Sequence, residues 1–252
     1  MKIILPRSRA EIESEQARLD ALADYDVLDT PAEQSFDRLT RLATHIFDVP
    51  MSTITFIDGH RQWFKSQQGM QTCETDREPA FCNVTIQHTQ PLVVPDAATD
   101  ERFSENPFVR GAPHIRFYAG VPLRSPAGQA VGSICAMDSR PRVFNARDTA
   151  ALSELAGLTI DLLEMQKRLR KAETGGRGAL KSEALEAGQL QFMRSAVACT
   201  VRARSATSAT VSVLDAASIP DRVALVIHTE GVSRLCRVSV RSDRNLELMF
   251  ES

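Results

Sequence analysis

Residues 115–123, IRFYAGVPL, and residues 131–137, VGSICAM, decide the fold of this chain. Both stretches are rich in β-branched and aromatic residues, which favour strands. The turn-forming residues 125–128, SPAG, lie between them. The sequence therefore predicts two strands joined by a tight turn.

Three further strands are predicted before this pair. Residues 52–57 stop at Asp58-Gly59, and residues 62–66 can return as the second arm of a hairpin. Residues 92–95 form another short predicted strand. The segment 97–113 that follows is long, polar and rich in turn formers, which inside a compact domain is typical of a functional loop.

Two helices are predicted ahead of the strands. Apolar residues at roughly helical spacing among charges favour a helix over residues 9–24. A second helix is expected to begin at Pro31, because Thr30 is placed to cap it and Glu33 completes a capping box. Its apolar stripe runs from Phe36 to Phe47.

A long amphipathic helix is predicted from Asn145 to about residue 173. Its apolar side chains cover more than one narrow stripe, and the helix breakers Thr174-Gly175-Gly176 follow. Such a helix needs a second surface to bury it, so we expect a homodimer through residues 9–24 and 146–173. The apolar residues are Leu152, Leu155, Leu158, Thr159, Leu162, Leu163, Met165 and Leu169.

Residues 175–252 differ in composition from residues 1–174. The first part holds 20 basic and 24 acidic residues, a net charge of −4, whereas the second holds 10 and 8, a net charge of +2. The tryptophan and both tyrosines lie in the first part. Short strands separated by turns in the second part favour a small antiparallel barrel or sandwich. We expect two domains, 1–174 and 175–252, with strands in the second at 190–193, 198–202, 210–214, 222–228, 236–241 and 246–250.

Composition argues against several classes of protein. The whole chain has 30 basic and 32 acidic residues, and its net charge of −2 argues against a general binder of nucleic acid or anionic membranes. No apolar run is long enough to span a bilayer, and Met1–Leu5 is too short for a signal-peptide core, so a cytoplasmic location is expected. Five cysteines without a C-x-x-C pair suggest reduced thiols.

The sequence lacks the motifs of catalysis and metal binding. Its five histidines are scattered without an i, i+4 pair, and no G-x-S-x-G, P-loop or dinucleotide fingerprint occurs. We therefore expect no metal, no cofactor and no enzyme activity.

Several motifs recur together in the first part: Leu28-Asp29-Thr30-Pro31, Phe36-Asp37-Arg38-Leu39-Thr40, Arg61-Gln62-Trp63-Phe64-Lys65, Ala80-Phe81-Cys82, Asp100-Glu101-Arg102-Phe103, Asn106-Pro107, Ile115–Leu123 and Gly132–Asp138. With them, the chain resembles the GAF family of sensory domains over about residues 15–170. The resemblance implies a central antiparallel sheet with helices behind it and a pocket in front, closed by the 97–113 loop. It also implies terminal helices that pack into a dimeric bundle. The subgroup is the bacterial one often found before histidine kinase or diguanylate cyclase domains, for which residues 175–252 are too few.

The second part is similar to a PilZ-type barrel. Such barrels bind cyclic di-GMP through an R-x-x-x-R arm and a [DN]-x-S-x-x-G strand motif. The nearest arm runs from Arg177 to Lys181, and a lysine cannot reproduce the planar stacking of a guanidinium. Only Ser205 of the strand motif is present. The expectation is a degenerate barrel that does not bind the nucleotide; the alternative is an altered nucleotide site made of Arg177, Lys181, Arg202, Arg204 and Ser205.

Aromatic and polar residues near the predicted strands are candidates to line a small-molecule pocket in the GAF part. They are Trp63, Phe64, Phe81, Cys82, Phe103, Arg116, Tyr118 and Cys135. The alternative is that the aromatic and cysteine side chains are core residues. In that alternative, Arg102 and Arg116 form salt bridges to Asp96, Asp100 or Asp138.

Cys82 is also a candidate for redox chemistry. It is expected near the start of a short helix, a position that lowers the pKa of a thiol. Free methionine sulfoxide reductases are GAF-like enzymes with two cysteines in one pocket, but Cys73, Cys82 and Cys135 do not follow their pattern. Bilin attachment is not expected, because Cys82 is followed by Asn83 rather than by histidine.

The resulting hypothesis is a cytoplasmic bacterial regulatory protein of the α+β class. A GAF sensor would be coupled to a degenerate PilZ-like barrel, and the barrel would act by contact with a signalling protein. One alternative is a cyclic di-GMP receptor with an altered site. The other is a thiol redox sensor, or an enzyme like the free methionine sulfoxide reductases, that uses Cys82.

Overall fold

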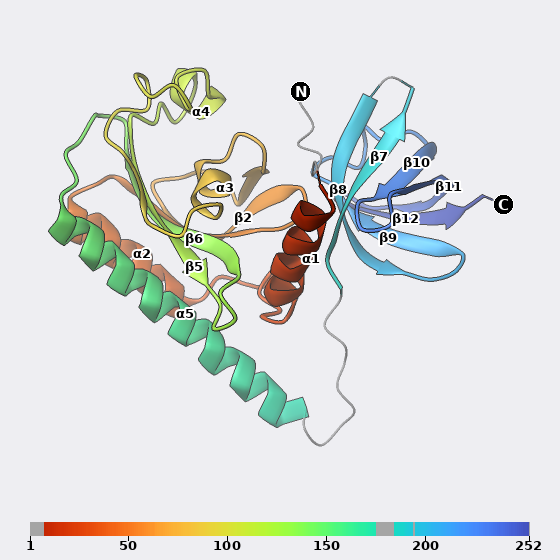
Figure 1. The fold of residues 1–252 in the computed structure, drawn as a ribbon, viewed down its shortest axis with the longest axis horizontal. Helices are drawn as coiled ribbons and strands as arrows, with labels where there is room; N and C mark the ends of the chain where they lie inside the picture. Colours follow the sequence, from red (N-terminus) through yellow and green to blue (C-terminus); the bar gives the residue numbers. More distant parts are fainter. Residues whose placement is uncertain (1–7, 175–183, 194, 252) are drawn as a thin grey trace. The chain divides into compact units, whose positions relative to one another are not determined.

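The computed structural model describes residues 8–174, 184–193 and 195–251 (Figure 1). The described residues form two compact units: the sheet unit, within Val27–Ile57 and Gln62–Gly178, and the barrel unit, within Met1–Asp26, Asp58–Arg61 and Ala179–Ser252. The helices are α1 (Arg9–Ala23), α2 (Gln34–Phe47), α3 (Phe81–Thr85), α4 (Pro107–Arg110) and α5 (Ala146–Thr174). The strands are β1 (Met51–Ile57), β2 (Arg61–Gln68), β3 (Glu74–Asp76), β4 (Leu92–Val94), β5 (Phe117–Arg124), β6 (Ala130–Asp138), β7 (Glu186–Phe192), β8 (Ser195–Arg204), β9 (Ser208–Ser212), β10 (Arg222–Ile227), β11 (Val232–Arg241) and β12 (Asn245–Phe250).

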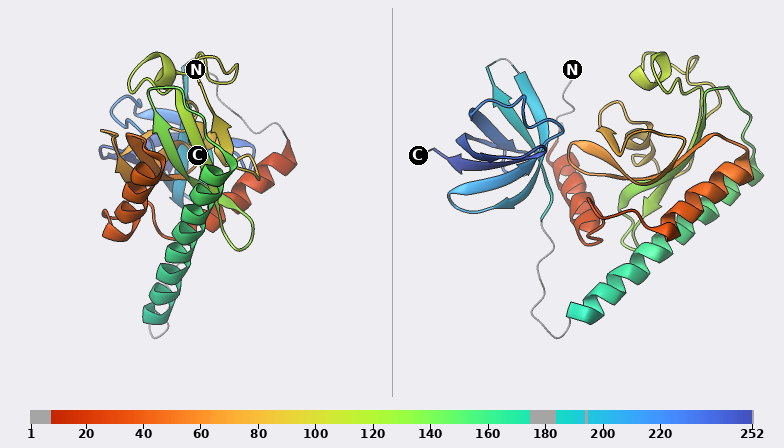
Figure 2. Two further views of the ribbon diagram at one scale, coloured as in Figure 1. Left: turned by 90° about the vertical axis from the view of Figure 1, so that its left-hand side faces the viewer. Right: turned by 180° about the vertical axis from the view of Figure 1, so that it is seen from behind.

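The sheet unit is built on a six-stranded sheet in the order β3-β2-β1-β6-β5-β4. Helices α2 and α5 cover its rear face, and α3 lies on its front face (Figures 1 and 2). Alternation along β5 sends Phe117 to the rear, where its ring lies 5.4 Å from that of Phe144, and Tyr118 to the front cluster around α3. The sheet is therefore buried on both faces.

The central strands β1 and β6 pair antiparallel, with Thr53 opposite Cys135 and Thr55 opposite Ser133. A Cβ atom at Gly132 would lie 1.9 Å from the carbonyl oxygen of Thr55, so a residue with a side chain cannot occupy this position without moving the backbone. Glycine thus allows the two strands to approach and fixes their register.

The predicted start of the second helix is wrong, because α2 begins at Gln34 rather than at Pro31. The Thr30 hydroxyl does not cap it: it donates to the Val27 carbonyl oxygen and accepts a hydrogen bond from Lys65 Nζ, both at 2.6 Å. Glu33 also pairs with Lys65 Nζ at 2.6 Å instead of closing a capping box. Lys65 of β2 therefore binds the Thr30 hydroxyl and the Glu33 carboxylate, and neither side chain caps α2.

The predicted cap of α5 is present. Asn145 Oδ1 accepts the N–H groups of Arg147 and Asp148, while the Asp148 carboxylate accepts the N–H group of Asn145. This reciprocal arrangement satisfies N–H groups that a helix start otherwise leaves unpaired. The helix then buries one apolar stripe in the sheet unit: Leu152, Leu155, Ala156, Thr159 and Leu163.

The barrel is a closed ring of six strands in the order β10-β11-β12-β9-β8-β7. Its interior is an apolar cluster in which Leu190, Val211 and Leu248 are completely buried. The expected α+β class is thus confirmed, with a sheet-and-helix domain followed by an all-β barrel consistent with a PilZ-like barrel.

The barrel unit also contains α1 and the turn Asp58–Arg61 between β1 and β2. The Gln16 amide of α1 donates to the Leu185 carbonyl oxygen at 2.8 Å, immediately before β7. In the turn, a Cβ atom on Gly59 would lie 2.8 Å from Thr200 Oγ1, so the turn fits closely against β8. The division into domains at residue 174 stays a prediction.

A buried polar network holds this turn. Thr200 Oγ1 accepts the N–H group of Gly59 at 3.0 Å and lies 2.8 Å from His60 Nδ1. Burial raises the pKa of the Asp58 carboxyl, but the charge and hydrogen bonds of His60, together with the charge of Arg61, outweigh burial and hold that pKa well below its usual value. The turn therefore carries a charged carboxylate with its partners inside the barrel unit.

Replacement of Thr200 by valine is expected to destabilise the protein by about 1–3 kcal/mol, because it leaves the Gly59 N–H group and His60 Nδ1 buried without this partner. Urea unfolding followed by circular dichroism measures the change. Thr210→Val is the matched control, because Thr210 on β9 is half-buried and makes no side-chain hydrogen bond in the described chain. An equal loss in both variants would contradict the role of the network.

Candidate functional site

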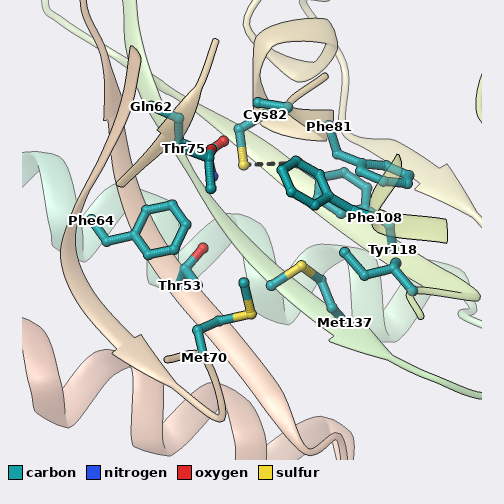
Figure 3. Close-up of a pocket in the computed structure, with 12 residues that line it drawn as sticks. Thr53, Gln62, Phe64, Met70, Thr75, Phe81, Cys82, Phe108, Tyr118 and Met137 are labelled. Atoms are coloured by element: carbon teal, nitrogen blue, oxygen red, sulfur yellow. Dashed lines mark hydrogen bonds between the residues drawn. The ribbon is translucent and has the colours of Figure 1, made fainter. Parts of the chain in front are cut away.

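A small cavity lies between the front of the sheet and α3 (Figure 3). Its volume is about 30 Å³. A buried water molecule needs roughly 10–15 Å³ measured this way, so the cavity has room for about two. The lining residues are Thr53, Gln62, Phe64, Met70, Thr75, Ala80, Phe81, Cys82, Phe108, Ile115, Tyr118 and Met137.

Stacked aromatic rings form one wall of the cavity. The Phe81 ring of α3 lies 4.2 Å from the ring of Phe103 and 5.0 Å from that of Tyr118. Tyr118 reaches this position because residue 120 is glycine: a Cβ atom there would lie 2.2 Å from the Tyr118 hydroxyl. The stack fixes the Tyr118 hydroxyl beside Cys82.

Two thiols meet beside this wall. Cys82 of α3 and Cys135 of β6 belong to the same buried cluster on the front of the sheet, and each is the largest influence on the pKa of the other. The Tyr118 hydroxyl lies 3.5 Å from Cys82 Sγ and 2.6 Å from Thr85 Oγ1. Thr53 Oγ1 lies 3.0 Å from Cys135 Sγ. A polar group of thiols and hydroxyls therefore sits within an apolar cluster.

The two thiols differ in acidity. Hydrogen bonding from Cys135, with further hydrogen bonds from Ser133, Thr55 and Tyr118, outweighs burial and lowers the pKa of Cys82 to about 6. The same contact with Cys82, together with burial, raises the pKa of Cys135 well above the usual value of a thiol. Burial also raises the pKa of Tyr118, which keeps its hydroxyl protonated as a donor. At neutral pH the thiolate form is therefore more populated for Cys82 than for Cys135.

Two oxygen atoms at the cavity are buried and have no hydrogen-bond partner in the described structure: Gln62 Oε1 and Thr75 Oγ1. Both side chains are drawn near Cys82 in Figure 3. Such atoms normally accept a hydrogen bond from a water molecule or a ligand. The cavity therefore offers two acceptors to a small molecule with O–H or N–H groups.

The structure brings together six of the eight residues proposed for the pocket. Phe64, Phe81, Cys82 and Tyr118 line the cavity. Phe103 and Cys135 stand directly behind them, in contact with Phe81 and Cys82.

Trp63 and Arg116 lie elsewhere. Trp63 alternates with Phe64 along β2 and stacks on Phe56 at 6.4 Å. Arg116 forms a salt bridge with Asp96 at 2.6 Å, and Arg102 forms one with Asp100 at 2.7 Å. Both arginines therefore form salt bridges with aspartates, as expected if they are structural residues instead of pocket residues.

Sequence reasoning missed several lining residues, including Thr53, Gln62, Met70 and Thr75. Strand alternation carries a signal for two of them, since Gln62 and Phe64 share one face of β2. Met70 and Thr75 lie beyond β2, where no periodic pattern points to the cavity.

The residues proposed as an alternative nucleotide site do not present free cations in the described barrel. Arg204 pairs with Glu186 at 3.0 Å and with Glu230. Arg202 Nε donates to Ser212 Oγ at 2.7 Å, and Ser205 Oγ accepts N–H groups of its own turn. Arg177 and Lys181 lie outside the described residues, as does the predicted breaker at 175–176.

Residues 8–174, 184–193 and 195–251 contain neither a metal-binding cluster nor a membrane-spanning helix. No group of three or more His, Cys, Asp or Glu side chains there is arranged to hold a metal ion. No helix in those ranges is both long and apolar enough to cross a membrane.

The sheet unit and its cavity define a sensory domain, and the chain belongs to the GAF family: residues 31–159 match the family model described as "GAF domain". A curated relative is the cyclic di-GMP phosphodiesterase PA2567 of Pseudomonas aeruginosa, 38% identical over 148 residues. The match covers 58% of this chain and 25% of the relative, so the chain spans about a quarter of that protein's length.

Two solved structures are similar to part of this chain. A free methionine-R-sulfoxide reductase from Neisseria meningitidis, solved in complex with its substrate, is 16% identical with a TM-score of 0.46, covering 67% of this chain and 98% of that one. A GAF sensor protein from Burkholderia vietnamiensis is 19% identical with a TM-score of 0.43, covering 65% and 94%.

The acidity of Cys82 can be tested by titration. The thiolate absorbance of Cys82, obtained as the difference between the wild type and Cys82→Ser, is expected to rise with pH around a midpoint of about 6. In Tyr118→Phe the midpoint should move upward, because the thiolate loses a hydrogen-bond donor. Tyr25→Phe, which removes another buried tyrosine hydroxyl, serves as the control. A wild-type midpoint in the ordinary thiol range of about 8–9 would rule out the proposed arrangement.

Proposed function

We propose that this protein is a signal-transduction regulator in which the GAF unit senses, α5 joins two copies, and the PilZ-like barrel acts by contact with a partner protein. The proposal includes a cytoplasmic location, because the five cysteines are free and reduced thiols prevail in reducing compartments. The observation that carries it is a second apolar stripe on α5, which the fold of one chain leaves exposed.

The second stripe of α5 has the spacing of a coiled-coil seam. Leu158, Leu162, Met165 and Leu169 follow one another at intervals of four, three and four residues. Three of them are more than half exposed: Leu158 by 51%, Met165 by 52% and Leu169 by 56%. Exposed apolar side chains in a heptad pattern favour pairing with a second helix of the same kind.

Helix α2 also exposes apolar side chains. It packs along α5 on the rear of the sheet, and it exposes Leu42 and Ile46, one turn apart (Figure 1). Leu155, in contrast, is buried and belongs to the core of the sheet unit. The seam proposed for the dimer thus consists of α5 residues from Leu158 onward. The second dimer contact expected from the sequence, through residues 9–24, remains part of the proposal.

Replacement of both Leu158 and Met165 by glutamate is expected to yield monomers, because four charges would face one another across the seam. Light scattering at micromolar concentration measures the mass. The matched control is Ala150→Glu with Gly157→Glu, which adds the same charge on another exposed face of α5.

The control variant should remain dimeric. A wild-type monomer, or equal dissociation of both variants, would overturn the proposed dimer. Circular dichroism of each variant shows whether the helix itself is retained.

The barrel is proposed to act without binding cyclic di-GMP. Glu186 and Glu230 already neutralise Arg204, and carboxylates at that place repel phosphates. Arg202 is held by Ser212 instead of projecting freely. The relative named as a cyclic di-GMP phosphodiesterase matches over a quarter of its length, which does not bring a phosphodiesterase activity to this chain.

Calorimetric titration of the full chain with cyclic di-GMP is expected to show no binding at micromolar concentration. A barrel of known nucleotide affinity is the positive control for the ligand. Micromolar binding that is lost in Arg202→Ala would contradict this proposal. It would favour a cyclic di-GMP receptor over a barrel that acts by protein contact alone.

A further inference from the structure

Cys82 and Cys135 are two thiols of one buried cluster, with the Tyr118 hydroxyl 3.5 Å from Cys82 Sγ and Thr53 Oγ1 3.0 Å from Cys135 Sγ. Cys82 lines the cavity, whereas Cys135 contacts Cys82 without being one of the lining residues. A small molecule in the cavity therefore meets Cys82 first. Cys135 is then placed to attack a sulfenic acid formed at Cys82.

The surroundings favour reaction at Cys82 over the two buried thiols of the barrel, Cys199 and Cys236. Its sulfur receives hydrogen bonds from hydroxyl groups, which stabilise a thiolate. In the barrel core, burial raises the pKa of Cys199 and of Cys236, and neither thiol lines this cavity. Those two cysteines are internal references for an unreactive thiol.

The size of the cavity selects the oxidant. A volume of about 30 Å³ holds two oxygen atoms, which is the size of hydrogen peroxide. Pockets for drug-sized ligands have volumes of about 300 Å³ or more, so this cavity is suited only to a much smaller molecule. Gln62 Oε1 and Thr75 Oγ1, which lack partners, can accept the two O–H groups of the peroxide.

We propose that Cys82 and Cys135 form a reversible disulfide when hydrogen peroxide enters the cavity. The Cys82 thiolate attacks one peroxide oxygen, so that an S–O bond forms, the O–O bond breaks, and hydroxide leaves and is protonated by solvent. The Cys135 thiol then attacks the resulting sulfenic acid: the S–S bond forms, the S–O bond breaks, and water leaves. Two thiols are oxidised and one peroxide is reduced to two waters.

The new bond would tie α3 to β6. Phe81 on α3 stacks on Phe103, and Asn106 Nδ2 donates to the Pro79 carbonyl oxygen at 2.7 Å. A displacement of α3 is therefore passed directly to the 97–113 loop that precedes β5. The proposal rests on the sensory function proposed above and names the signal, a small peroxide.

Oxidation of the full chain by hydrogen peroxide tests the chemistry. After acid quenching, unfolding and alkylation, mass spectrometry of the wild type should show a peptide pair linked through Cys82 and Cys135. Cys199 and Cys236 should react at least about tenfold more slowly. Cys135→Ser should accumulate sulfenic acid at Cys82, trapped by dimedone, and Cys82→Ser should form neither product.

Three results would overturn the proposal: sulfenic acid that appears first on Cys135, oxidation of Cys82 no faster than that of Cys199, or equal disulfide formation with free methionine-R-sulfoxide. The third would favour the reductase instead. Cumene hydroperoxide, too large for the cavity, should react far more slowly than hydrogen peroxide. Because these readouts include wild-type rates and need no partner, they remain decisive if a variant fails to fold. Their failure would leave the dimer and the sensory function untouched.

Discussion

The approach of β6 to β1 at Gly132 is the constraint on which the sheet unit depends. The carbonyl oxygen of Thr55 occupies the space that a Cβ atom would need, so the pairing of the two strands is held in one register. A slip by one residue would turn every side chain of the strand to the other face. In the observed register, Thr53 lies opposite Cys135 on the front face, beneath α3. The hydrogen bonds that lower the pKa of Cys82 therefore depend on the backbone packing of the two central strands, β1 and β6.

Local pattern allowed most elements to be predicted, and distant contacts explain the misses. The β-branched run 52–57, the cap at Asn145 and the six barrel strands all carry their own signals. The start of α2 failed because Lys65, brought from β2, takes Thr30 and Glu33 away from the helix. Strand β3 was missed because Glu74–Asp76 is short and polar, without alternation.

Only part of the candidate site could be predicted from the sequence, because the positions of its side chains also depend on distant contacts. The sequence named both Trp63 and Phe64, but neighbouring residues of a strand face opposite sides, so only one of them can line a front cavity. The meeting of Cys82 with Cys135 depends on how α3 packs, which no spacing in the sequence reveals. The net charge of +2 for residues 175–252 suggests a basic barrel. It does not reveal that Glu186 and Glu230 form salt bridges with Arg204, because the three residues are distant in the sequence.

The composition of the barrel unit has a consequence for the order of folding during synthesis. Its described parts come from three stretches of the chain, and the hydrogen bond from Gln16 to Leu185 spans 169 residues. Helix α1 leaves the ribosome long before β7 has been made, so it must wait for its partner strand. Contacts between such distant residues form slowly, because the chain between them loses entropy before the contact is rewarded. The sheet unit is therefore expected to fold first, and a fragment of residues 175–252 alone would lack both α1 and the Asp58–Arg61 turn that complete the barrel unit.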